Sequence, residues 1–225
     1  MNGTTHDEIR FHLVGDSRFG SGDSCNFTSS ITAATYMNAL NVFFGRYASY
    51  DAGFYPSPNT DLAANTTFTA MRTDGAMACT ALMMDKWLAA KSVVYAYEFS
   101  DANAPNTATG PVKLQNGGKF PLGAYHVAEL QYLFPHTGTV ACGLPYAGLS
   151  APQKNLAAAM VTYWTQFATV GNPNPPAASL PIWPRYSAAS PNMLSLLGGG
   201  PKLLAAASFD AFHKCSALWG PVVSQ

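Results

Sequence analysis

The sequence predicts a mixed α/β fold, and three observations support this prediction. A strongly apolar run at 92–99 is typical of a buried strand, helix-like apolar stripes lie before and after it, and turn residues separate these segments. At 225 residues, the chain is long enough to bury a sizeable core. Only one run indicates an interior strand, which is too few for a complete doubly wound sheet, so we expect a partial domain.

The first half of the chain contains two expected helices and the strand. The first helix should run from Ser30, a suitable N-cap, to Gly45, a suitable terminator. The second should follow Gly75, because apolar residues recur every four positions on one face: Cys79, Met83 and Trp87. The segment 92–99 then supplies the strand, since β-branched and aromatic residues fill nearly every position, as in a strand covered on both faces.

The middle of the chain combines a long loop with the clearest helix. Residues 101–118 are rich in Asn, Pro and Gly and predict a surface loop near a binding site. The helix should begin at Ser150, because Pro152 lies in its first turn and Gln153 stands at the capping-box position. Gly171 should end this helix.

The last part of the chain predicts a hairpin and a final helix. Segments 193–197 and 202–206 are expected to pair around three consecutive glycines, and Ser208 is expected to cap the helix that follows. Neither an internal repeat nor a linker divides the sequence. We therefore interpret residues 1–225 as one part of a single domain.

The composition excludes several classes of protein. Charged residues make up 11% of the chain and hydrophobic residues 48%, which is typical of a compact globular protein. Twelve basic residues balance twelve acidic ones without a basic run, so nucleic acid is not an expected partner. No apolar run approaches the roughly 20 residues of a membrane span, and the first residues lack the basic and apolar regions of a signal peptide.

The four cysteines lie far apart in the sequence, at Cys25, Cys79, Cys142 and Cys215. They form no C-x-x-C pair and have no histidine at zinc-ligand spacing, so we expect no metal site and no cofactor. One or two disulfides and buried free thiols both remain open from the residues alone.

A candidate catalytic histidine, His126, lies in a loop after the predicted strand that opens into a short helix. Loops at the carboxyl ends of strands often carry the sites of α/β sheets. Taken alone, His126 is more simply interpreted as a histidine that caps this helix. A catalytic triad would require a carboxylate to orient the histidine and a nucleophile to give it a proton.

The sequence around His126 resembles the histidine segment of the type-B carboxylesterase and cholinesterase family, with Gly123, His126 and Glu129 at the family's positions. The opening segment 2–8 resembles the turn that carries the family's triad acid, and this likeness maps the acid to Glu8. The resemblance covers almost the whole chain, because further matches follow in the family's order at 73–79, 94–99, 163–168, 171–174, 183–184 and 213–219.

This resemblance implies the C-terminal portion of an α/β-hydrolase sheet with flanking helices, with the nucleophile-bearing N-terminal part absent. It implies a serine carboxylesterase acting on small uncharged carboxylic esters. By this resemblance, Glu8 would orient His126, and His126 would act as general base and then as general acid. Glu129 would be a buried residue that supports the histidine without taking part in the reaction directly. The resemblance also implies a Cys79–Cys215 disulfide and a secreted or periplasmic protein, whereas Cys25 and Cys142 match nothing in the family.

The family's nucleophile elbow, G-x-S-x-G, does not occur in the sequence. Ser17, Ser21 and Ser150 lie near glycines, but none has both glycines at the required spacing. Without a serine and two amide donors, a chain lacks both the attacking atom and the groups that stabilise the oxyanion. We therefore expect no ester hydrolysis by this chain alone.

Two other functions remain open. The first is an SGNH-type esterase that uses Ser17, Asp210 and His213, because a Gly-Asp-Ser and an Asp-x-x-His pattern lie near the two ends, although the Gly-x-Asn-Asp block of that family is missing. The second is a non-catalytic, cholinesterase-like binding module, which the low charge and aromatic content would suit.

Overall fold

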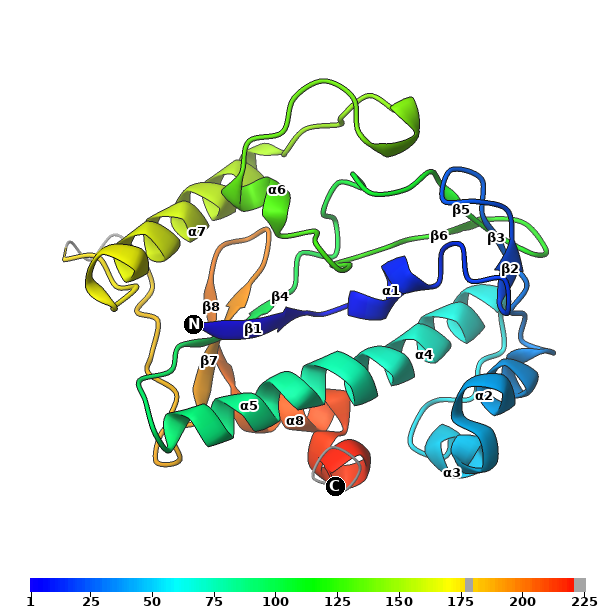
Figure 1. Ribbon diagram of the computed structural model, residues 1–225, viewed down its shortest axis with the longest axis horizontal. Coiled ribbons are helices and arrows are strands. Elements are labelled where there is room, and N and C mark those ends of the chain that lie inside the picture. Colours follow the sequence, from blue (N-terminus) through cyan, green and yellow to red (C-terminus); the bar gives the residue numbers. More distant parts are fainter. Residues whose placement is uncertain (177–179, 221–225) are drawn as a thin grey trace.

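The fold is described from a computed structural model that places residues 1–176 and 180–220. Its main sheet has four strands in the order β1-β4-β7-β8 (Figure 1). The first three are parallel and β8 is antiparallel to β7. Their bounds are Asn2–Thr5 for β1, Ala96–Phe99 for β4, Asn192–Leu196 for β7 and Lys202–Ala205 for β8.

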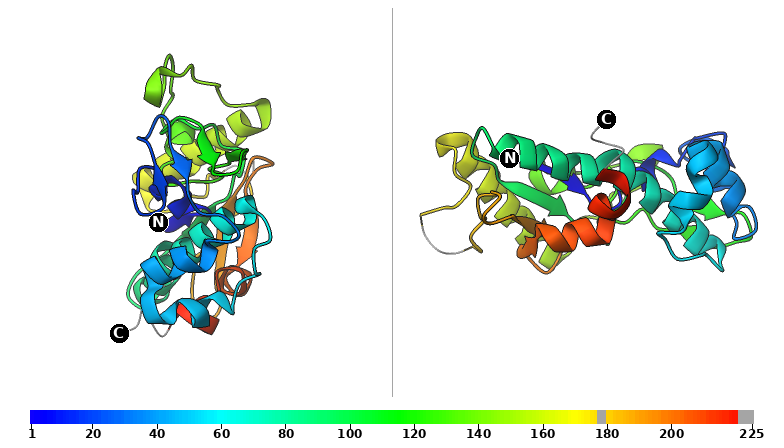
Figure 2. Two further views of the ribbon diagram at one scale, coloured as in Figure 1. Left: turned by 90° about the vertical axis from the view of Figure 1, so that its right-hand side faces the viewer. Right: turned by 90° about the horizontal axis from the view of Figure 1, so that it is seen from below.

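Helices lie on both sides of this sheet. In the view of Figure 1, α7 lies above the strands, and α4, α5 and α8 lie below them; Figure 2 shows the same arrangement from two other directions. The bounds of the helices are Glu8–His12 for α1, Tyr36–Phe44 for α2, Ala48–Ala52 for α3, Asp61–Thr73 for α4, Cys79–Ala89 for α5, Leu130–Leu133 for α6, Ala151–Val170 for α7 and Ala206–His213 for α8. No helix of the described residues is both long enough and apolar enough to cross a membrane.

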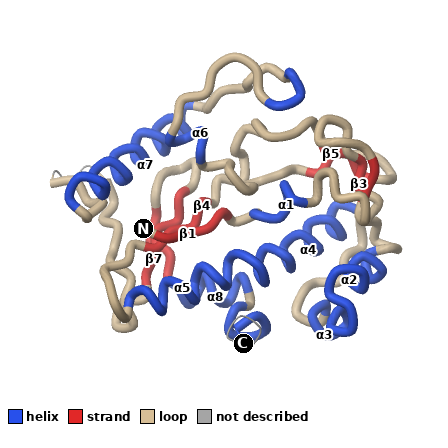
Figure 3. Tube along the Cα trace, viewed as in Figure 1, coloured by secondary structure: helices blue, strands red, loops and turns tan. Residues whose placement is uncertain are grey.

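A second, smaller sheet lies at the far end of the molecule, beyond α1 and α4 (Figure 3). Its order is β2-β3-β5-β6, with bounds Gly20–Ser21, Thr28–Ser29, Val112–Leu114 and Lys119–Phe120. It corrects the expectation that 101–118 is loop throughout, because β5 lies in this segment and pairs in parallel with β3. The mixed α/β class is confirmed, but the main sheet has two interior strands, β4 and β7, where the sequence indicated one.

The helix α7 forms as the sequence predicts. Gln153 Oε1 accepts a 2.9 Å hydrogen bond from the Ser150 backbone amide, which completes the capping box, and Gly171 ends the helix with a φ of 72°. The hairpin of β7 and β8 also forms as predicted. The last helix does not begin at Ser208, because α8 starts at Ala206 and its N-cap residue, Ala205, offers no side-chain bond.

Helix α4 is the largest element that the sequence pattern did not predict. Its N-cap residue is Thr60, whose hydroxyl accepts a hydrogen bond from the Ala63 amide, and the helix continues through a π-helical turn at Asp74–Ala78 into α5. The expected helix start after Gly75 is therefore wrong. Threonine and asparagine weaken its local helix propensity, whereas full burial of Ala64, Phe68 and Met71 stabilises it through tertiary packing.

Two other boundaries differ from the prediction. Helix α2 does not begin at Ser30 but at Tyr36, because a turn closed by Thr32 and Thr35 comes first; it ends at Gly45 as expected. The strand predicted at 92–99 is regular only over β4, and Val94 makes an isolated bridge to Tyr186. The first difference follows from a local turn, and the second involves a bridge to a segment that is distant in the sequence.

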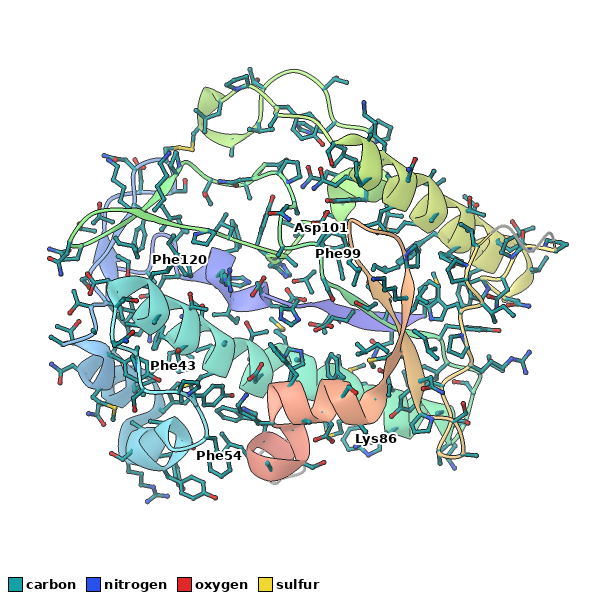
Figure 4. All side chains as sticks on the ribbon, turned by 180° about the vertical axis from the view of Figure 1, so that it is seen from behind. Phe43, Phe54, Lys86, Phe99, Asp101 and Phe120 are labelled. Atoms are coloured by element: carbon teal, nitrogen blue, oxygen red, sulfur yellow. A yellow bond between two sulfur atoms is a disulfide. The ribbon has the colours of Figure 1, made fainter. Side chains whose placement is uncertain are left out.

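The carboxyl end of β4 anchors α6 and α7. Phe99 and Asp101 lie close together at this end in Figure 4. The ring of Phe99 lies 5.0 Å from that of Tyr132, and Asp101 Oδ2 accepts hydrogen bonds from the Tyr132 hydroxyl at 2.6 Å and from Gln153 Nε2 at 3.0 Å. Because Tyr132 lies in α6, directly after the loop that carries His126, this loop is tied to the sheet.

Candidate active site

Glu8 lies in the turn that follows β1 and is the first residue of α1. The residue is almost fully buried. Its Oε1 atom accepts hydrogen bonds of 2.8 Å from the Thr5 backbone amide and 3.0 Å from the Thr4 hydroxyl. Two donors on one oxygen fix the carboxylate in place and leave Oε2 for another donor.

His126 supplies that other donor from the loop between β6 and α6. Its Nδ1 atom lies 2.8 Å from Glu8 Oε2, and its backbone amide donates a longer bond, of 3.4 Å, to the Glu8 carbonyl. The His126 side chain is 42% exposed, and Nε2 makes no hydrogen bond to any residue in the described part of the chain. A carboxylate at Nδ1 keeps the proton there, so Nε2 is the nitrogen that can accept a proton.

Asp7 and Arg10 clasp the turn of Glu8 to the loop of His126. The Asp7 amide donates a 2.9 Å hydrogen bond to the Ala124 carbonyl, and the Ala124 amide donates one of 2.9 Å to Asp7 Oδ2. Arg10 lies 2.9 Å from Asp7 Oδ1 and donates a 3.1 Å bond to the Pro121 carbonyl. We call these four residues the Asp7 clasp: Asp7, Arg10, Pro121 and Ala124.

A comparison with known proteins identifies the family of the chain. A model of the carboxylesterase family matches residues 25–205, a range that contains His126. The chain belongs to the carboxylesterase family. This confirms the resemblance to type-B carboxylesterases, and the mixed α/β architecture agrees with a part of an α/β-hydrolase fold.

Similar members of the carboxylesterase family include three curated proteins. The chain is 32% identical to the acetylcholinesterase of Bungarus fasciatus over 108 residues, which are 47% of this chain and 15% of that protein. It is 34% identical to the bile salt-activated lipase of Bos taurus over 79 residues, 33% of this chain and 12% of the lipase. It is 35% identical to the carboxylesterase 4A of Bos taurus over 96 residues, 42% of this chain and 14% of that protein. The matches thus span about a seventh of the relatives' lengths or less.

Glu129, the third residue that the carboxylesterase resemblance singled out, lies close to this pair without bonding to it. Its Oε2 atom is buried and has no hydrogen-bond partner among the described residues. Burial raises the pKa of the Glu129 carboxyl, and the charge of Glu8 raises it further. A supporting role for Glu129 remains a prediction.

Two rings of α1 flank the exposed side of His126. The Phe11 ring stacks on His126 with 6.4 Å between the centroids, and the His12 ring lies 5.0 Å away. Burial lowers the pKa of His12, and the charge of His126 lowers it further. Both effects favour the neutral form of His12 beside the candidate base.

The described residues include all four cysteines, which form two disulfides and leave no cysteine free. Cys79–Cys215 is the pair that the carboxylesterase resemblance implied, and it is buried. Cys25–Cys142 was not predicted, because its partners are 117 residues apart and no local pattern marks them. This second disulfide joins the turn between β2 and β3 to the loop that precedes α7.

The alternative triad of Ser17, Asp210 and His213 is not formed. Both ring nitrogens of His213 are engaged, Nδ1 at 2.6 Å from Asp74 and Nε2 at 2.9 Å from Glu98. Burial lowers the pKa of His213, but the hydrogen bonds to the two carboxylates outweigh this and raise the pKa to about 9. Asp210 instead accepts hydrogen bonds from Ser216. A buried histidine with no free nitrogen cannot serve Ser17 as a general base.

Proposed function

We propose that this chain supplies the acid, Glu8, and the general base, His126, of a serine carboxylesterase whose nucleophile lies on a segment outside the 225 residues. The 2.8 Å contact between Glu8 Oε2 and His126 Nδ1 carries the proposal. In a triad, such a contact holds the imidazole in the required tautomer and stabilises its positive charge after proton transfer. Membership of the carboxylesterase family supports carboxylic ester hydrolysis as the reaction.

Each step of the proposed reaction uses one nitrogen of His126. Nε2 takes the proton of the serine hydroxyl as the serine oxygen attacks the ester carbonyl, and the resulting imidazolium then protonates the departing alcohol. Water repeats the sequence on the acyl-serine and releases the carboxylic acid. Glu8 remains ionised throughout and stabilises the imidazolium from Nδ1.

Two features support completion of the site by a further segment. Among the described residues, β1 is the outer strand of the main sheet, and Glu8 follows its carboxyl end. A parallel strand added along the open edge of β1 would end on the same side as Glu8, so the residue after it would lie near His126. The buried Oε2 atom of Glu129, which has no hydrogen-bond partner among the residues that the structure describes, could also gain one there.

The proposed substrates are small uncharged carboxylic esters. The chain has equal numbers of acidic and basic residues and no basic run, which does not favour nucleic acid as a partner. We further propose a secreted or periplasmic protein, because disulfides such as Cys79–Cys215 and Cys25–Cys142 form and persist in oxidising compartments.

The test is hydrolysis of a p-nitrophenyl ester of a short fatty acid by the longer protein that carries this chain with its serine-bearing segment. We expect His126→Ala and Glu8→Gln each to lower kcat by about 10³-fold or more. His136→Ala, which removes an exposed histidine elsewhere, is the control and should leave kcat unchanged. Full activity of His126→Ala would overturn the proposal.

A second measurement uses the chain by itself. The Nδ1 proton of His126, held by a carboxylate, should give a low-field proton resonance in NMR spectra, and the resonance should disappear in His126→Ala and shift upfield in Glu8→Gln. A resonance that is the same in Glu8→Gln would show that Glu8 does not hold the histidine. If the resonance behaves as expected but the longer protein has no esterase activity, a cholinesterase-like binding module becomes the better interpretation.

A further inference from the structure

A second cluster of ionisable residues lies beside the turn of Glu8 and takes no part in the proposed triad. It consists of His6 after β1, Glu98 in β4 and His213 at the end of α8. Glu98 Oε1 lies 2.8 Å from His6 Nδ1 and 2.9 Å from His213 Nε2. The three atoms all lie within 4.8 Å of one another, so one ion could contact all of them.

The cluster and its neighbour Asp74 contain two buried carboxylates. Glu98 and Asp74 are both buried, at 5% and 2% exposure, and His213 lies between them. Buried carboxylates are stable only when their charge is compensated. A divalent cation bound at this cluster would supply such compensation.

The cluster also has the outer support that metal sites use. A histidine that binds a metal through one nitrogen usually donates its other N–H to a carboxylate, which orients the ring. Asp74 Oδ1, 2.6 Å from His213 Nδ1, holds this position. Glu98 is held in turn, because its Oε2 accepts a 3.0 Å hydrogen bond from the Ser100 hydroxyl.

We propose that His6, Glu98 and His213 bind one Zn²⁺ ion. Two imidazole nitrogens and one carboxylate oxygen are typical ligands of zinc, and a fourth position remains for water. The His6 side chain is 30% exposed, which provides a route for the ion. Zinc–ligand bonds of about 2.0–2.2 Å require the ligand atoms to lie roughly 3.3–3.5 Å apart. The contacts of Glu98 with the two histidines therefore have to lengthen by about half an ångström.

Co²⁺ is the probe for the test, because a tetrahedral Co²⁺ ion absorbs visible light and Zn²⁺ does not. The chain, freed of metal with EDTA, should bind one equivalent of Co²⁺ at pH 8 with visible bands that Zn²⁺ abolishes. His6→Ala should weaken binding at least 100-fold, and His136→Ala, which removes an exposed histidine outside the cluster, should bind like the unchanged chain. The circular dichroism of both variants should match that of the unchanged chain.

Proton release provides a measurement that depends on no variant. Binding of one metal ion should release protons, detected with a pH indicator in weakly buffered solution, and affinity should increase with pH. Absence of a stoichiometric Co²⁺ complex, or binding without proton release, would show that the cluster is a closed hydrogen-bonded network only. Equal binding by His6→Ala would place the ion elsewhere and overturn the assignment. None of these results depends on esterase activity.

Discussion

Asp7 and Ala124 form a reciprocal pair of hydrogen bonds: the Asp7 amide donates to the Ala124 carbonyl at 2.9 Å, and the Ala124 amide donates to Asp7 Oδ2 at 2.9 Å. These two residues are 117 positions apart. The pair places the turn of Glu8 next to the loop of His126. Loss of this contact should therefore affect the candidate site as well as stability.

Asp7→Asn should destabilise the protein by about 1.5–3 kcal/mol, because the change removes the charge that Arg10 pairs with and weakens the acceptor for the Ala124 amide. Urea unfolding measures the loss in the free energy of unfolding. Hydrogen exchange of the Ala124 amide should also become faster, because this amide loses its charged acceptor. Asp23→Asn, in an exposed turn where an asparagine oxygen can still accept, is the control and should change little. Equal stability of Asp7→Asn and the unchanged chain would contradict a structural role for the clasp.

Gly123→Ala should cost about 2–4 kcal/mol of stability. Gly123 has a φ of +66°, and an added Cβ would lie 2.2 Å from Asp7 Oδ2, so the substitution strains the backbone and displaces the clasp. Gly117→Ala is the matched control, because Gly117 also has a positive φ, +98°, but has no atom within 4 Å of an added Cβ. The control should lose only about 1–2 kcal/mol. Equal losses in thermal or urea unfolding would show that the Asp7 contact contributes nothing.

The two disulfides should be reduced in a fixed order when the chain is folded. Cys25 is exposed and Cys142 is half-buried, whereas Cys79 and Cys215 are only 3% and 4% exposed. A thiolate has to reach the sulfur that it attacks, so limiting dithiothreitol should reduce Cys25–Cys142 first. Alkylation followed by peptide mass spectrometry measures the order. Simultaneous reduction of both pairs in the folded chain would contradict it.

Asp85→Asn should stabilise the protein at pH 8 but not at pH 3. Asp85 is 1% exposed, and burial raises the pKa of its carboxyl to about 6, against a hydrogen bond from Asn2 that lowers it. A raised carboxyl pKa means that the folded state holds the proton more tightly than the unfolded state. Stability is therefore lost as the pH rises from about 4 through 6. The asparagine removes this cost, and the gain at pH 8 should approach about 2–3 kcal/mol.

Urea unfolding of Asp85→Asn and the unchanged chain at both pH values tests this dependence. At each pH, the free energy of unfolding of the variant is compared with that of the unchanged chain, so the contributions of other titrating groups cancel in the difference. A difference in stability that is the same at pH 3 and pH 8 would rule out a buried, ionising Asp85 as its cause.

Local patterns predicted those parts of the fold whose stability is local. Ser150, Gln153 and Gly171 bound α7 because caps act within one turn of a helix, and Gly45 ends α2 for the same reason. Helix α4 was missed because its threonines are poor helix formers and only burial of Phe68 and its neighbours stabilises it. The interior position of β7 was missed because sheet order depends on pairing between distant segments.

The sequence by itself indicated the family and singled out Glu8 and His126. The order of the family's motifs along the chain can be recognised without knowing which residues are in contact. The tertiary structure decided which atoms meet: the carboxylate of Glu8 on Nδ1 of His126, the Asp7 clasp beneath them, and the Cys25–Cys142 bond. It also removed His213 from the list of candidate bases by placing it between Asp74 and Glu98. The physical reason is sequence separation: the Glu8–His126, Asp7–Ala124, Cys25–Cys142 and His213 contacts join residues 115 or more positions apart, and no local propensity carries information over that separation.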